Sequence, residues 1–251
     1  MTPETDHELA ARLAEKAGGV LLDLRSTRGD QDPKALGKAG DAASHQVLIT
    51  ALADSRRDDA ILSEEAADDQ VRLKSRRVWI IDPLDGTREF AEKGRADWAV
   101  HVALVADGEL VAGAVALPAQ RMTLTTATAL VLKPPTPGTI RMLVSRTRPP
   151  AVALDVAREL NAELVPMGSA GAKAMAVVLG AGDVYLHAGG QYEWDSAAPV
   201  AVATAAGLHV SRLDGSPLQY NQPNPWLPDL LICRPELAVP IIALAQAAAE
   251  W

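Results

Sequence analysis

An apolar segment that runs directly into two carboxylates restricts the fold of this chain more than any other feature. The stretch WIIDPLDGTREF, residues 79–90, places Asp82 and Asp85 at the end of a run with too many apolar residues to face water. Such a run before a turn signal predicts a buried strand, with both acids at its carboxyl end. Two anions this close repel each other and are costly to bury unless a cation or strong donors compensate them. The chain must therefore fold around a compensated acidic site.

The chemistry of this segment favours a hard divalent cation. Carboxylates, backbone carbonyls and water are the ligands that Mg²⁺ prefers. Pro83 fixes the turn, so the two carboxylates and the Leu84 carbonyl can converge on one side. The following residues, Gly86-Thr87-Arg88, would open a helix whose N–H groups face an anion. A metal beside a helix N-terminus makes a phosphate site, although an Asp-Pro-x-Asp-Gly string is also ordinary turn chemistry.

Further acids occur at the ends of expected strands and at the start of an expected helix. The segment LSEE brings Glu64 and Glu65 to the end of another strand, and YEWDSAAP places Asp195 at the start of an apolar helix. Each acid by itself is better explained as an exposed side chain or a helix cap than as a metal ligand. Together with the aspartate pair they form a set, which supports the metal-site interpretation.

Composition limits the classes of partner. The chain has 251 residues, of which 48% are hydrophobic and 22% charged, as in a globular protein with a substantial core. Its net charge of −8 argues against nucleic-acid or anionic-membrane binding, and no run approaches the roughly 18 apolar residues of a membrane span. Cys233 is the single cysteine, and the acidic N-terminal segment lacks a signal-peptide pattern. We expect a cytoplasmic protein that binds small molecules or cations, with no nucleic acid and no membrane.

Periodicity divides the N-terminal half into helices followed by strands. Apolar spacing predicts an opening helix that ends near Arg25, a loop over residues 26–40, and a second helix that begins at Asp41 as its N-terminal cap. Short buried strands follow, and turn signals at residues 107–108 and 118 predict an antiparallel meander.

The segment LKPPTPGT, residues 132–139, is the best linker candidate in the chain. After it, strands alternate with helices, which predicts an α/β layer with a mostly parallel sheet. The chain is therefore expected to be α/β overall. Residues 1–133 would form an α+β half with most of the metal ligands, and residues 139–251 an α/β half with the substrate-binding segment and the last metal ligand.

Three ordered motifs, SEE, DPLDGT and WDSAA, resemble those of the Mg²⁺-dependent, lithium-sensitive phosphatases of the inositol monophosphatase family. The resemblance extends from Asp41 to about Gly215. It implies a five-layered α-β-α-β-α sandwich with the site between its two halves, and two or three Mg²⁺ ions. The metal ligands that it implies are Glu64, Asp82, the carbonyl of Leu84, Asp85 and Asp195.

The same resemblance implies the catalytic residues. Asp41 and Thr87 match the pair that orients the attacking water, and Glu64 completes the catalytic group as a metal ligand. The chain departs from the family before Asp41, where it reads LGKAGDAAS in place of a Ser-Pro-Val-Thr-like string. The match at Asp41 is therefore carried by its position rather than by its neighbours.

Three further strings resemble the nucleotidase branch of the family, namely GTREF, GSAGAK at residues 168–173, and VSRTR around Arg146. The resemblance implies hydrolysis of the 3′-phosphate of 3′-phosphoadenosine 5′-phosphate, with the corresponding phosphosulfate as a second substrate in sulfate assimilation. Arg146 would pair with a second phosphate. The expected substrate contacts are Gly86, Thr87, Arg88, Ser145, Arg146, Ser169, Gly171, Lys173 and Asp195.

Two other functions stay open at this point. The first is an inositol-1-phosphate or fructose-1,6-bisphosphate phosphatase on the same scaffold. The second is a non-catalytic binding partner that keeps the metal site as a relic. The partner expected here is a small phosphorylated nucleotide, and a homodimer is compatible with the sequence.

Overall fold

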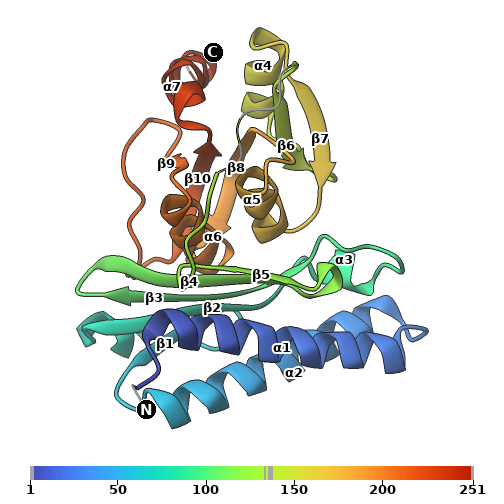
Figure 1. Cartoon of the computed structure of the whole chain (residues 1–251), viewed down its shortest axis with the longest axis vertical. Helices are drawn as coiled ribbons and strands as arrows, with labels where there is room; N and C mark the ends of the chain where they lie inside the picture. Colours follow the sequence, from blue (N-terminus) through green and yellow to red (C-terminus); the bar gives the residue numbers. More distant parts are fainter. Residues whose placement is uncertain (1–2, 133, 135–137, 250–251) are drawn as a thin grey trace.

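Two β-sheets alternate with three layers of helices in the computed structural model, which describes residues 3–132, 134 and 138–249 (Figure 1). Strands such as β2 (Arg77–Asp85) are buried along almost their whole length, so both faces of each sheet need an apolar cover. Three separate clusters of buried side chains fill the spaces between the layers. This arrangement confirms the five-layered sandwich.

The first layer consists of α1 (Asp6–Arg28) and α2 (Pro33–Ser55), which cover the outer face of the first sheet (Figure 1). Thr5 and Glu8 form a reciprocal capping box at the start of α1. Leu9, Leu13 and Leu21 then fall on one face of the helix and are buried against the sheet.

The first sheet has the order β1-β2-β3-β4-β5. β1 pairs with β2 in parallel, and the remaining neighbours are antiparallel, so the expected meander is confirmed. The strands other than β2 are β1 (Ala60–Ser63), β3 (Ala99–Ala106), β4 (Glu109–Leu117) and β5 (Met122–Thr125). The short helix α3 (Thr87–Ala91) follows β2 directly, as the sequence predicted.

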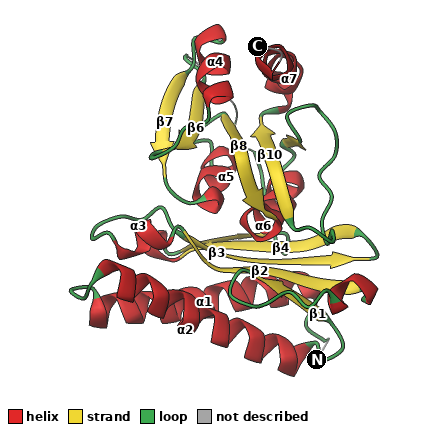
Figure 2. Ribbon diagram, turned by 180° about the vertical axis from the view of Figure 1, so that it is seen from behind, coloured by secondary structure: helices red, strands yellow, loops and turns green. Residues whose placement is uncertain are grey.

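The central layer contains α5 (Ala170–Val178) and α6 (Glu193–Ala205), which share one apolar cluster with both sheets. The second sheet lies beyond them, and α4 (Ala151–Glu159) and α7 (Pro235–Ala249) cover its outer face (Figure 2). Its strands, in the order β7-β6-β8-β10-β9, are β6 (Arg141–Ser145), β7 (Glu163–Met167), β8 (Val184–Tyr192), β9 (His209–Ser211) and β10 (Trp226–Cys233). Within the described ranges, no helix is long and apolar enough to cross a membrane.

Two expectations about the fold are wrong. The second sheet is mixed rather than mostly parallel, because β10 runs antiparallel to both β8 and β9. Residues 33–40 are helical rather than a loop, so α2 begins two turns early and Asp41 lies inside it. The cap is Asp32, whose side chain accepts a hydrogen bond from Ala35 N. The glycines that suggested a loop are tolerated because they face the turn after β2, where a side chain would not fit.

The expected linker falls largely outside the described residues, which omit 133 and 135–137. The strands of the first sheet all precede it, and those of the second sheet all follow it. The division into residues 1–133 and 139–251 stays a prediction.

The position of the cap gives a test of this helix boundary. Asp32→Ala should lower the free energy of unfolding by about 1 kcal/mol, because an N-terminal donor of α2 loses its acceptor. Asp41→Ala should raise it by about 0.5 kcal/mol at pH 8, since alanine is the better residue inside a helix. Urea unfolding of both variants measures the difference, and the reverse order would place the cap at Asp41.

Candidate active site

The irregular C-terminal end of β2, between Asp82 and Asp85, presents polar groups from a buried strand. Asp82 is only 1% exposed, and its Oδ1 accepts a hydrogen bond from Leu84 N at 3.0 Å. Ser44 of α2 donates to the Pro83 carbonyl at 2.6 Å and fixes the turn from the other side. Proline supplies a carbonyl but no N–H, so this bond satisfies its backbone completely.

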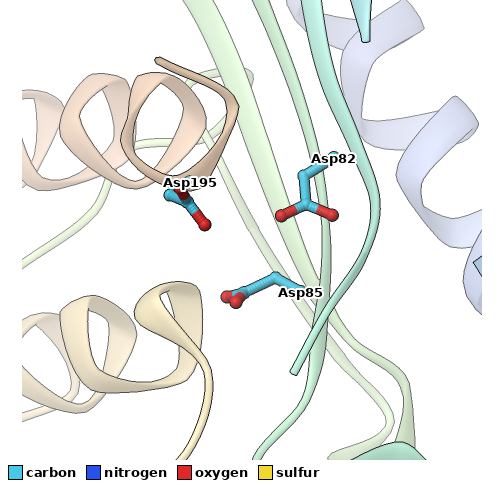
Figure 3. Close-up of side chains that lie close together, drawn as sticks. All are labelled: Asp82, Asp85 and Asp195. Atoms are coloured by element: carbon cyan, nitrogen blue, oxygen red, sulfur yellow. The ribbon is translucent and has the colours of Figure 1, made fainter. Parts of the chain in front are cut away.

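Three carboxylates converge between the sheets. One oxygen each from Asp82, Asp85 and Asp195 lies within 4.8 Å of the others. Figure 3 shows Asp82 and Asp85 pointing from β2 toward Asp195 in the first turn of α6. The Asp195 side chain is held there by Tyr192 N, which donates to its Oδ2 at 2.7 Å. Acids from both halves of the chain therefore share one site.

Mutual repulsion dominates most of this site. Burial, followed by the nearby Glu64, Asp85 and Asp195, raises the pKa of Asp82 well above its usual value. Burial and the charge of Asp85 raise the pKa of Asp195 to about 6. Glu64 lies at the exposed rim, yet partial burial and Asp195 raise its pKa to about 7. These acids repel one another without a compensating cation.

The pKa of Asp85 is shifted in the opposite direction to the pKa of the other acids in the cluster. Burial by itself would raise its pKa, but His101, Ser169 and Lys173 outweigh burial and lower it to about 2. The backbone N–H groups of Ala170 and Gly171, at the start of α5, donate to its two carboxylate oxygens at 3.1 and 2.7 Å. The Asp85 charge is therefore compensated by a helix N-terminus.

The donor set fits a hard divalent cation. Ser169 and Gly171 donate to Asp85 Oδ2, whereas, among the described residues, Oδ1 accepts only from Ala170 N and retains a free lone pair. All the converging ligand atoms of the cluster are oxygens. A cation bound among them would relieve the repulsion that raises the pKa of Asp82 and Asp195. The carbonyl of Leu84, which accepts from Thr87, points to the same turn.

Asp41 and Thr87 meet beside this cluster, as the sequence predicted for their positions. Thr87 Oγ1 lies 3.4 Å from Asp41 Oδ1 and 3.2 Å from Leu84 O. A hydroxyl has one proton, so it can donate to only one of them at a time. Burial and the charge of Glu65 raise the pKa of Asp41 to about 7. This carboxylate can therefore gain or release a proton near neutral pH.

A pocket of about 480 Å³ opens next to the acids. It collects most of the expected substrate contacts, namely Gly86, Thr87, Arg88, Ser145, Arg146, Ser169, Lys173 and Asp195, together with Glu64 and Asp85. Asp41 lines a neighbouring pocket that shares Thr87 and Arg88 with it. Asp82 and Leu84 are buried behind the wall of the pocket. Gly171 contributes only its N–H to Asp85.

Two expected substrate contacts already have protein partners. Lys173 is buried, and its Nζ donates to the carbonyls of Gly168 and Ser169, at 2.5 and 2.8 Å. Burial lowers its pKa to about 8. Arg146 forms ion pairs with Glu89 and Glu92 rather than facing the pocket unpaired.

The sequence did not identify His101 as a site residue. It is fully buried on β3, its Nε2 lies 3.2 Å from Asp85 Oδ2, and its Nδ1 lies 3.0 Å from Trp194 O. The one sequence feature that could have indicated it is a histidine within the otherwise apolar run WAVHVALV. In the structure, the strand register places His101 opposite Asp82. Other pocket residues outside the expected set include Arg148, Tyr185, His187 and Gln191. Arg148 ends the VSRTR string, whereas the other three lie on β8, where the sequence showed no matching motif.

The fold and the acid cluster agree with a family assignment. The model of the "Inositol monophosphatase family" matches residues 3–132 and 138–248. The chain therefore belongs to the inositol monophosphatase family, whose members are generally metal-dependent.

Curated relatives of this chain carry a more specific name. It is 54% identical over 246 residues to the 3′-phosphoadenosine 5′-phosphate phosphatase of Mycobacterium leprae, covering 93% of this chain and 91% of that protein. The same name belongs to a Mycobacterium tuberculosis protein with 55% identity, covering 94% and 90% of the two chains. A solved structure of CysQ from Bacteroides thetaiotaomicron aligns with a TM-score of 0.74 at 24% identity over 90% of this chain and 96% of that one. That likeness supports the fold alone.

Repulsion among the acids predicts how pH and a divalent cation affect stability. With pKa values raised to about 6 and about 7, folded Asp195 and Glu64 hold protons that the unfolded chain releases above about pH 4. Their stabilising contribution is complete below pH 4 and is lost as the pH rises through 7. Adding Mg²⁺ should therefore raise the melting temperature by about 5 °C at pH 8 and by less at pH 5.

Asp82→Asn tests the origin of this effect. It should raise the melting temperature in a chelator at pH 8 and reduce the gain from Mg²⁺, because one repelling ligand is removed. Asp107→Asn is the matched control, since Asp107 pairs with Arg76 at the surface. Scanning calorimetry measures each shift. An undiminished gain in Asp82→Asn would contradict the cation site.

Proposed function

We propose that this chain is a Mg²⁺-dependent phosphatase that hydrolyses the 3′-phosphate of 3′-phosphoadenosine 5′-phosphate to give AMP and phosphate. The observation that carries the proposal is an acid cluster beside a pocket whose walls include Arg88 and Arg148, which form no ion pair among the described residues. The carboxylates can bind divalent cations, and the basic side chains of the pocket wall can bind a substrate with more than one phosphate. The mycobacterial relatives with this named activity support the choice of nucleotide.

Glu64, Asp82, the Leu84 carbonyl, Asp85 and Asp195 would hold two or three Mg²⁺ ions. When bound, Mg²⁺ supplies positive charge against the phosphate and lowers the pKa of water. The chain provides both halves of the ligand set, since β1 and β2 position the first four residues and α6 positions the fifth. The N-terminal N–H groups of α5 keep Asp85 ionised for this role.

Thr87 and Asp41 would orient the attacking water and take up its proton. When Thr87 donates to Asp41, the lone pairs of its hydroxyl are free to accept from water. A water proton can then pass through Thr87 Oγ1 to Asp41, whose raised pKa makes it a suitable acceptor near neutral pH. The rate of attack by water should therefore depend on the positions of Thr87 Oγ1 and the Asp41 carboxylate oxygen.

Substrate comparison tests the proposed function. We expect kcat/KM for 3′-phosphoadenosine 5′-phosphate to exceed the values for inositol 1-phosphate and fructose 1,6-bisphosphate by at least about tenfold, because the pocket of about 480 Å³ with its basic side chains has room for a nucleotide with two phosphates. Steady-state phosphate release at saturating Mg²⁺ provides the comparison. A preference for inositol 1-phosphate would overturn the nucleotide assignment, and no hydrolysis of any of the three would favour a binding role.

Thr87 is held by a close approach of α2. A Cβ added to Gly37 would lie 2.6 Å from Thr87 Cγ2, which is closer than real Cβ atoms come to a neighbour. The helix that replaces the expected loop therefore packs backbone to side chain against Thr87. Any side chain at position 37 must displace either the helix or the threonine.

Gly37→Ala should lower kcat by about tenfold to a hundredfold, because it shifts the hydroxyl that orients water. Thr87→Ser removes the clashing methyl and keeps the hydroxyl, so the double variant should recover most of the lost activity. Gly19→Ala in α1 is the control, since no atom lies within 4 Å of the added Cβ. It should keep full activity and gain about 0.5–1 kcal/mol of stability. A double variant no better than Gly37→Ala would rule out the steric contact as the cause.

A further inference from the structure

Arg146, just after β6, contacts the middle and the C-terminal end of the short helix α3. Its Nε donates to Glu89 Oε1 at 2.6 Å, and its Nη2 donates to Glu92 Oε2 at 2.7 Å. The two acids are three positions apart, so they lie on the same side of the helix end. One planar guanidinium therefore spans two carboxylates, which lysine could not do.

The pair with Glu89 is the more protected of the two. The Glu89 side chain is 8% exposed, whereas that of Glu92 is 49% exposed. Glu89 also lies directly against the turn before α5, since a Cβ on Gly168 would come within 2.3 Å of Glu89 Cγ. The next residue, Ser169, caps α5 and donates to Asp85. Contacts therefore run without a gap from Arg146 through Glu89 to the acid cluster.

The opposite side of α3 is fixed as well. Arg25 of α1 donates to the carbonyls of Glu92 and Arg95, at 2.6 and 2.8 Å. A helix of five residues has little stability of its own. Phe90 packs in the core and Gly37 of α2 approaches Thr87, and the two arginines add polar contacts that fix the position of the helix further.

Other cations in the pocket are better placed to meet substrate. Arg88 and Arg148 line the same pocket as Arg146. Among the residues that the structure describes, neither of them makes an ion pair. The Nε and Nη2 groups of Arg146 are already directed at two carboxylates, one of them buried, so its charge is largely compensated within the protein.

We propose that Arg146 is a positioning residue, which fixes α3 and Thr87 against the C-terminal half through Glu89 and does not bind the substrate. The proposal rests on the phosphatase function stated above. Loss of either partner would let α3 move and displace the Thr87 hydroxyl, so the turnover step is slowed, while Arg148 and the rest of the pocket outside α3 largely keep the affinity for the substrate. The two residues act as one unit, so their losses do not add.

A double-mutant cycle tests this role in the full-length enzyme. Arg146→Met, Glu89→Gln and the double variant are compared with the wild type on 3′-phosphoadenosine 5′-phosphate. Each single change should lower kcat by about tenfold and leave KM within about threefold, and the double variant should match the singles. Arg76→Met is the control, because it breaks an ion pair whose side chains are 83% and 60% exposed, and its kinetics should not change.

Three outcomes would overturn the proposal. A KM raised more than about tenfold by Arg146→Met at unchanged kcat would make Arg146 a substrate ligand. Losses that multiply in the double variant would make the two residues independent, and unchanged kinetics would leave them without a role. Circular dichroism and melting temperature check folding, and Arg146→Lys replaces the methionine variant if that variant does not fold. Its single ammonium cannot span both acids, so a lowered kcat is again expected.

Failure of the proposed function gives a different result. A wild-type enzyme that hydrolyses inositol 1-phosphate and not 3′-phosphoadenosine 5′-phosphate would disprove the nucleotide assignment. The same four enzymes, assayed on inositol 1-phosphate, would still report whether Arg146 and Glu89 are coupled.

Discussion

The charge of Asp85, buried against the N-terminus of α5, is the interaction on which the rest of the site depends. It joins β2 of the first sheet to the layer between the sheets, through the Ser169 hydroxyl and two backbone N–H groups. A buried carboxylate without such donors would be costly, and a helix N-terminus without an acceptor would leave orphan donors. Each group therefore needs the other, and the interaction fixes how far apart the two halves of the chain lie. His101 adds a third element, because β3 brings its imidazole to the same carboxylate.

This one compensated acid divides the site into two kinds of charge. The pKa of Asp85 is lowered to about 2, whereas the pKa of Asp195, Glu64 and Asp41 is raised to between about 6 and about 7. The helix N-terminus and His101 compensate Asp85 most directly, whereas burial and the neighbouring carboxylates outweigh them at the remaining acids. A site of this kind attracts cations without needing a basic residue among its ligands. The basic side chains are instead found along the adjoining pocket, where an anionic substrate fits.

Two arginines make further contacts between the two halves of the chain near the site. On one side, Arg146 spans Glu89 and Glu92. On the other, the buried Arg72 pairs with Asp68 and donates to Asn221 Oδ1 and the Gln222 carbonyl. The contacts of Arg72 fix the loop that follows Glu64, and those of Arg146 fix the helix that begins at Thr87. Two short segments of the site, the loop after Glu64 and the helix that begins at Thr87, are therefore each anchored to the other half of the chain by contacts of an arginine. Such anchoring keeps loop-borne groups in place with little packing of their own.

The sequence by itself determined the local units of the site. An apolar run, an Asp-Pro turn and a glycine with a φ of +85° specify the strand, turn and helix from residue 77 to 91, since all these signals act over a few positions. It also predicted that Asp41 and Thr87 belong together, through resemblance rather than through local physics. Only the tertiary structure decided which segments meet. The partner of Asp85 is 84 to 86 positions away, that of Arg146 is 57 away, and no periodicity encodes such pairings. For the same reason, residues 33–40 looked like a loop: their glycines are unfavourable in an isolated helix, and become necessary only when that helix packs against Thr87.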